Sequence, residues 1–156
     1  MPDQTNSADP ANLRPFIGAF SIWYVCALLA LTGISFATGV GFGYIGNIAI
    51  LVAAAVMTGV RFADDMGRDF EGREKWKLAL FCLLASFVWS FLNTMVVTFL
   101  FTAEEGRQNF LAAVANMPVT AWVFSLAIVS FFYYFALVLF LGVGVKNSLR
   151  KQGRTE

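Results

Sequence analysis

Three carboxylates in the most highly charged stretch of this chain are spaced so that they could hold a metal ion. Asp64, Asp65 and Asp69 follow the pattern D-D-x-x-x-D within RFADDMGRDFEGREKWK, residues 61–77. Aspartates one helical turn apart can converge on one cation, and carboxylate oxygen is a preferred ligand of Mg²⁺. A complete site needs a second acidic cluster, but Glu104 and Glu105, the acidic pair outside this stretch, are predicted to lie on the opposite side of the membrane. A metal-dependent membrane enzyme that uses these carboxylates is therefore the least favoured of three hypotheses.

The rest of the chain offers little other catalytic chemistry. It contains no histidine, which removes both the commonest general base and the commonest transition-metal ligand. Cys26 and Cys82 each lie near the middle of an apolar block, where the expected role is that of a small buried hydrophobic residue and not a disulfide. We therefore predict a protein that is not an enzyme, with no catalytic residue, no cofactor and no metal.

The elements that must position these residues are predicted to be membrane-spanning helices. The chain is 58% hydrophobic and 13% charged, whereas soluble domains are about 45–50% apolar and about 25% charged. Uncharged blocks at about 15–38, 40–60, 78–102 and 118–145 each suffice for the roughly 20 residues that cross a bilayer core. A helix satisfies its backbone polar groups internally. The predicted fold is all-α: a polytopic membrane protein with four transmembrane helices in a bundle.

The basic residues predict the orientation of this four-helix transmembrane domain, residues 15–145. Of the 11 lysines and arginines, only Arg107 falls in the predicted external loop, 103–117. The positive-inside rule therefore places the loop 61–77, the basic tail 146–156 and both termini in the cytoplasm. The polar N-terminal segment 1–14 is expected to be disordered. Residues 103–117 fit either a short helix on the membrane surface or a plain loop.

The cytoplasmic loop allows a structural interpretation and also resembles a known family. In a helix it would form three ion pairs with the acid four residues before the base: Asp64–Arg68, Asp69–Arg73 and Glu71–Lys75. Gly67 and Gly72 make two short helices joined by a bend equally acceptable. Phe62, Gly67 and Arg68 form F-x-x-x-x-G-R, followed by Glu74 and an apolar span.

This motif and the span layout resemble the ABZJ-type family of small four-span bacterial inner-membrane proteins. The resemblance implies a location in the bacterial inner (plasma) membrane and brings no activity. By this analogy Gly67, Arg68 and Glu74 are the candidate contact residues of the cytoplasmic loop.

Polar residues within the spans form a second candidate site. No span contains a charged side chain, which disfavours a proton-coupled transporter. The candidate intramembrane polar cluster consists of Asn47, Ser86, Ser90, Asn93, Tyr133 and Tyr134. Asn47 and Asn93 lie at similar depth by helical rise, so we expect them to hydrogen-bond directly or through water. The polar face of the third span either packs against another helix or lines a pathway, and packing is favoured.

Three functional hypotheses follow from these residues. The first is a noncatalytic accessory or scaffold protein, whose partners are the lipid bilayer and other membrane proteins or a second copy of itself. A stripe of small residues, Gly46, Ala49 and Ala53, provides a surface for close helix packing. The second is a small permease or channel for a neutral or weakly polar solute. The third is the metal enzyme described above. With a formal net charge of +1 and no long basic face, nothing suggests a nucleic-acid partner, and we predict none.

Overall fold

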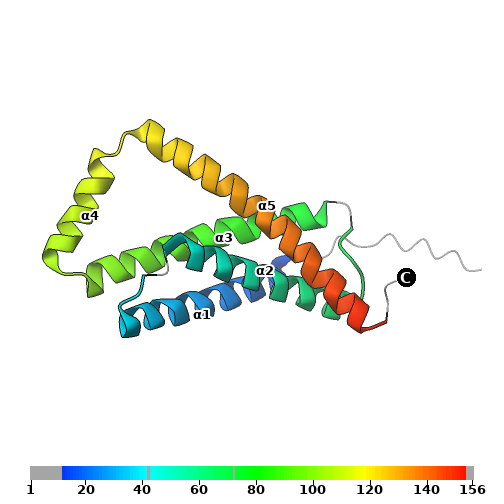
Figure 1. The fold of residues 1–156 in the computed structure, drawn as a ribbon. Helices are drawn as coiled ribbons and strands as arrows, with labels where there is room; N and C mark the ends of the chain where they lie inside the picture. Colours follow the sequence, from blue (N-terminus) through cyan, green and yellow to red (C-terminus); the bar gives the residue numbers. More distant parts are fainter. Residues whose placement is uncertain (1–11, 42, 72, 154–156) are drawn as a thin grey trace, which may run out of the picture.

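The computed structural model describes residues 12–41, 43–71 and 73–153, and within them all regular secondary structure is helical. The elements are α1 (Arg14–Thr38), α2 (Gly43–Met66), α3 (Glu74–Val96), the π-helical turn η1 (Val97–Phe101), α4 (Glu104–Asn116) and α5 (Val119–Lys151). Figure 1 shows α1, α2 and α3 running alongside one another, α4 lying across one end, and α5 slanting across the others. Most of the predicted N-terminal segment, residues 1–11, lies outside the described residues.

Four helices among the described residues are long and apolar enough to cross a membrane. They are α1, α2, α5 and the continuous helix formed by α3 with η1. This confirms the predicted all-α membrane fold with four spanning helices. The end of the bundle that carries α4 is called the α4 end below. The opposite end, where α1 begins, α5 ends and α2 is joined to α3, is called the loop end (Figure 1).

The helices extend further into the charged segments than the apolar blocks indicate. Residues 61–66 continue α2, so that the irregular connection to α3 begins at Gly67. Most of the basic tail likewise continues α5 as far as Lys151. Residues 104–116 form the helix α4, one of the two alternatives for that segment. Charged residues at a helix end can stay in contact with water or headgroups, which explains why hydropathy alone places the ends too early.

The hydrophobic core lies toward the loop end. Its largest fully buried aromatic side chains are Phe16, Phe20 and Tyr24 from α1 and Phe62 from α2. On α5 no residue before Leu137 is buried. The half of α5 nearest α4 therefore leaves the bundle, as Figure 1 shows, and the other half packs mainly on α2.

Two glycines set the close approach of α2 and α5. A Cβ atom placed on Gly144 would lie 3.1 Å from the Cα of Gly59, and one on Gly59 would lie 3.2 Å from the Cα of Gly144. Each would also meet a backbone carbonyl of the opposite helix, that of Val56 or Leu141. Membrane helices approach this closely where small residues remove the side-chain barrier.

The predicted packing stripe on α2 is not the face that the other helices of this chain cover. Of Gly46, Ala49 and Ala53 only Gly46 is buried, and the two alanines face outward. The buried face of α2 lies instead along Leu51, Ala54, Ala55, Thr58 and Phe62. Many small residues occur all around this helix, so their spacing alone does not identify the face that another helix covers.

Candidate functional site

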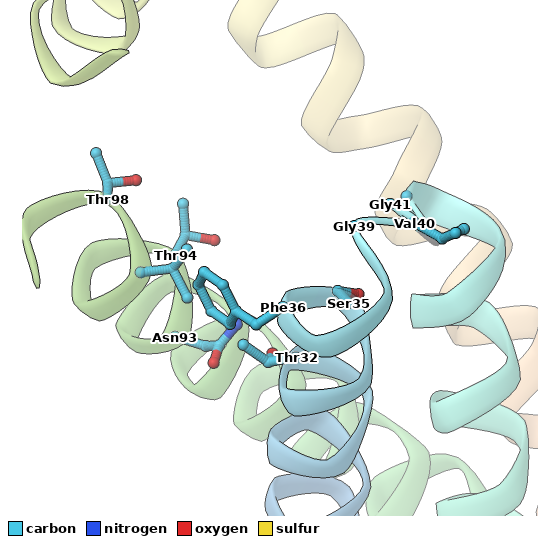
Figure 2. A pocket seen from close by; sticks show the side chains of 11 residues that line it. Thr32, Ser35, Phe36, Gly39, Val40, Gly41, Asn93, Thr94 and Thr98 are labelled. Carbon is cyan, nitrogen blue, oxygen red and sulfur yellow. The ribbon is translucent and has the colours of Figure 1, made fainter. Parts of the chain in front are cut away.

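Two adjoining cavities open between α1, the start of α2 and the end of α3, toward the α4 end. Their volumes are about 450 and 310 Å³, within the usual range for small-molecule sites. They share Thr32, Ser35, Gly43 and Asn93. Figure 2 shows the larger one, with Thr32, Ser35 and Phe36 from α1 and Asn93 and Thr94 from α3. Together they are called the polar cavity below.

The polar groups of this cavity are all neutral. It is lined by the hydroxyls of Thr32, Ser35, Thr94 and Thr98 and by the amides of Asn47 and Asn93, and by no charged side chain. An asparagine amide supplies two N–H donors and one carbonyl acceptor. Within the described part of the chain, neither amide has a side-chain hydrogen bond. The structure therefore brings Asn47 and Asn93 to the same cavity without a direct hydrogen bond between them, and the predicted bond through water stays a prediction.

The ends of two helices shape the mouth of the cavity. α1 ends at Gly39, whose φ of +68° favours glycine and whose N–H donates to the carbonyl of Ser35 at 2.9 Å. On the other side, η1 replaces the last α-helical turn of α3 with a π turn, and Thr98 on this turn is nearly buried against the cavity. Single π turns occur frequently at functional sites. The π turn therefore places the side chain of Thr98 at the cavity.

The cavity is closed toward the loop end. On α1, Tyr24 lies one turn nearer the loop end than Leu28. Its hydroxyl is fully buried and forms a hydrogen bond of 2.8 Å with the hydroxyl of Ser90. Ser86 lies deeper, is buried in the core, and donates to the carbonyl of Leu83 at 2.8 Å. Ser86 and Ser90 therefore lie beneath the cavity and do not line it. The arrangement is a pocket that opens at one end.

The two candidate tyrosines lie away from the polar cavity. The ring of Tyr133 stacks on that of Phe87, with 6.4 Å between the ring centroids. The hydroxyl of Tyr134 donates to the backbone carbonyl of Trp76 at 3.4 Å, at the loop end of α3. Of the six residues in the predicted cluster, only Asn47 and Asn93 share a cavity.

Sequence reasoning missed the hydroxyl residues that complete the cavity, above all Thr32, Ser35 and Thr98. A signal was present, because Thr32 and Ser35 are one turn apart on α1, and both are polar within an apolar block. Such hydroxyls also bond to their own helix backbone. Their spacing therefore does not reveal whether they face a cavity.

The three candidate loop residues lie close together at the loop end. Gly67 ends α2 with a φ of +63°, and the guanidinium of Arg68 then donates to both carboxylate oxygens of Glu74, at 2.9 and 3.0 Å. The same carboxylate accepts the backbone N–H of Glu71 at 3.1 Å. These hydrogen bonds to Glu74 raise the pKa of Arg68 above its ordinary value. Arg68 and Glu74 thus satisfy each other and join the end of α2 to the start of α3.

Aromatic rings pack against the pair formed by Arg68 and Glu74, which we call the clamp. The Arg68 guanidinium carbon lies 5.7 Å from the centroid of the Phe62 ring, a distance at which a cation and a ring attract. Phe62 also stacks on Phe70, with 4.2 Å between centroids, and contacts the ring of Phe16. The charged pair is thereby attached to the hydrophobic core.

The three predicted ion pairs of this loop were wrong. The structure forms Arg61–Asp65, Arg68–Glu71 and Arg68–Glu74 instead. The reason is that α2 stops at Met66, so that residues 69–73 are not in helical register with residues 64–68. Asp64 accepts hydrogen bonds from Ser148 of α5 and from Gln152, the residue that follows α5, the latter at 2.9 Å.

The aspartates of this stretch do not converge on one point. Asp64 is engaged with α5, and the Asp69 carboxylate caps the backbone N–H of Phe70 at 2.7 Å. Among the described residues no three histidine, cysteine or acidic side chains form a group that could hold a metal ion.

Comparison with known proteins adds no family to this description. No family model, no curated protein and no solved structure matches the chain. Its function is therefore inferred from its own residues.

Proposed function

We propose that this membrane protein is a small permease that binds a neutral, hydrogen-bonding solute in the polar cavity. The observation that supports this function best is the pair of amides, Asn47 and Asn93, which face one uncharged cavity and have no hydrogen-bond partner among the described residues. The cavity favours the permease over the accessory protein, since helix packing alone would cover or pair these groups.

The energetic argument concerns what fills the cavity. A polar amide in an apolar environment costs roughly 2–7 kcal/mol if it makes no hydrogen bond. A lipid tail supplies no donor or acceptor, so lipid cannot offset this cost. Water or a polar solute can satisfy both amides and the hydroxyls of Thr32 and Ser35. The occupant of the cavity is therefore polar.

The lining also defines the class of solute. No charged side chain lines the cavity, and a bare ion would find no counter-charge there. Hydroxyls and amides donate and accept equally well, which suits a small molecule with hydroxyl or amide groups. The solute class is thus small, neutral and weakly polar.

Transport requires a second conformation. The Tyr24–Ser90 hydrogen bond and the core beneath it close the cavity at the loop end. Release to that side requires the Tyr24 hydroxyl to separate from Ser90. We assign this pair as the inner barrier of the permease.

Flux measurements on proteoliposomes test this function. The proteoliposomes are mixed with glycerol or with urea as the probe solute, and stopped-flow light scattering records how they shrink and then reswell as the solute enters. We expect faster reswelling than in protein-free liposomes, and loss of this excess in the double variant Asn47→Leu/Asn93→Leu. Asn109→Leu removes an exposed amide on α4 that does not line the cavity and is the matched control. Equal flux in the wild type and the double variant for both solutes would refute the permease.

A second candidate is the accessory or scaffold protein, which the position of α5 favours. Before Leu137 this helix has no buried residue, and it exposes Phe131, Phe132 and Phe135. A transmembrane helix that leaves its own bundle has a free surface for the helix of another membrane protein. Crosslinking in membranes, followed by pull-down in mild detergent, should then recover one defined partner. Recovery of the chain alone would count against this candidate.

The proposed location is the bacterial inner membrane with both termini in the cytoplasm. The resemblance of the loop around Gly67, Arg68 and Glu74 to the ABZJ-type family supports the membrane, and the basic residues support the orientation. The polar cavity would then open toward the outside of the cell.

A further inference from the structure

We propose that the loop end carries a binding site for the headgroup of an anionic phospholipid, independent of the polar cavity. A separate cavity of about 510 Å³ lies between the start of α3 and the middle of α5. It is lined by Arg73, Trp76, Lys77, Leu80 and Tyr134. We call it the basic cavity.

One face of α3 and one residue of α5 build this cavity. Trp76, Lys77 and Leu80 lie on one side of α3, and Arg73, the residue that precedes the helix, lies one turn before Trp76 and Lys77 on the same side. Tyr134 closes the opposite side. Its ring centroid lies 5.9 Å from that of Trp76, and its hydroxyl donates to the backbone carbonyl of Trp76 at 3.4 Å. Contact between two helices thus forms the cavity.

The charge of the cavity calls for an anion. Neither Arg73 nor Lys77 has an ion-pair partner within the described residues. The nearest acids in sequence, Glu71 and Glu74, contact Arg68 instead, at 3.4 and 2.9 Å. α5 brings no acid toward the cavity, since residues 119–145 contain no charged side chain. Two positive side chains that have no ion-pair partner among the described residues therefore face the same space.

The apolar part of the lining favours a lipid over a soluble anion. Tryptophan and tyrosine concentrate where the hydrocarbon core meets the headgroups, and the cavity contains one of each. Leu80 lies one turn deeper than Trp76 and Lys77 and is about half exposed, toward the region of the acyl chains. A phospholipid whose phosphodiester lies beside Arg73 and Lys77 and whose acyl chain lies along Leu80 matches both the charged part and the apolar part of the lining. Basic cavities between membrane helices are known to take such headgroups.

Lipid binding to the purified full-length protein tests this proposal. The protein in a mild uncharged detergent is mixed with phosphatidylglycerol or phosphatidylcholine, and bound lipid is quantified by native mass spectrometry. We expect preferential retention of phosphatidylglycerol. Arg73→Gln/Lys77→Gln should weaken its binding roughly 30-fold, from the effect of two basic contacts near the membrane surface. Lys146→Gln/Arg150→Gln removes two exposed positive charges elsewhere at the loop end and should leave binding unchanged.

Further measurements distinguish a lipid headgroup from a soluble anion, and specific binding from a general effect of positive charge. Leu80→Gln keeps both cations and should weaken lipid binding, which an ion site would not show. If the charge variant fails to fold, judged by helicity and gel filtration, the Leu80→Gln result decides the question. Equal retention of the two lipids, equal loss in both charge variants, or displacement of phosphatidylglycerol by inorganic phosphate would each overturn the lipid site.

Discussion

The guanidinium of Arg68 joins the end of α2 to the start of α3. It pairs with Glu74, lies over Phe62, and has only 28% of its side chain exposed, against 16% for Glu74. Because hydrogen bonds between charged groups contribute more than neutral ones and this pair is partly shielded, Arg68→Gln should lower the free energy of unfolding by about 1–2 kcal/mol. Thermal unfolding in detergent micelles measures this loss.

Arg61→Gln is the matched control for Arg68. Arg61 and Asp65 are 3.6 Å apart, and both side chains are more than half exposed. Exposed pairs contribute at most about 0.2–1 kcal/mol, so this variant should stay close to the wild type. If both variants lose the same stability, Arg68 contributes only a surface charge and the clamp is not structural.

Asn93 and Ser90 differ in what they contribute. Asn93 faces the polar cavity and has no side-chain hydrogen bond within the part of the chain that the structure describes, whereas Ser90 hydrogen-bonds to the buried Tyr24 hydroxyl. We therefore expect Asn93→Leu to change the free energy of unfolding by less than about 0.5 kcal/mol. Ser90→Ala should lower it by roughly 1–2 kcal/mol, because a buried hydroxyl loses its partner. The same unfolding assay measures both, and marked destabilisation by Asn93→Leu would mean that its amide has a structural role.

At the scale of helices, the close crossing of α2 and α5 depends on glycine at positions 59 and 144, where neither residue has a side chain. Gly59→Ala or Gly144→Ala would force a methyl group against the backbone of the opposite helix. Overpacking of this kind costs typically about 1–3 kcal/mol, and we expect a loss in that range from thermal unfolding. Gly33→Ala is the control, since a Cβ on Gly33 meets nothing within 4 Å. Equal stability of Gly59→Ala, Gly144→Ala and Gly33→Ala would show that the helices can separate without cost.

The same crossing explains what the sequence could and could not predict. Helix lengths could be predicted because charge-free blocks must span the bilayer. The residue that Gly59 packs against could not be predicted, because any glycine or alanine in the chain allows close approach. Only the assembled backbone shows that it is Gly144. The ion pairs of Arg68 depend on the exact residue, Gly67, at which α2 stops. The polar cavity depends on how α1, the start of α2 and the end of α3 lie against one another, which no local pattern encodes.

At the scale of the whole molecule, charge is divided between the two ends of the bundle. Among the described residues Arg107 is the one basic side chain at the α4 end, and it forms an ion pair with Glu104. The remaining basic residues of the described chain lie at the loop end. Positive-inside asymmetry of this strength predicts that the loop end lies in the cytoplasm. The polar cavity and the basic cavity then belong to opposite leaflets.

Single cysteines labelled in intact cells test this orientation. In a Cys26→Ala/Cys82→Ala background, Asn109→Cys on α4 should react with a membrane-impermeant maleimide, because Asn109 is exposed at the α4 end. Gly153→Cys, exposed just after α5, should react only after the cells are permeabilised. The opposite pattern would reverse the assignments: the polar cavity would open to the cytoplasm, and the basic cavity would face the outer leaflet. Solute entry from outside would then have to begin at the Tyr24–Ser90 barrier, so the labelling result fixes the direction in which the permease must be assayed.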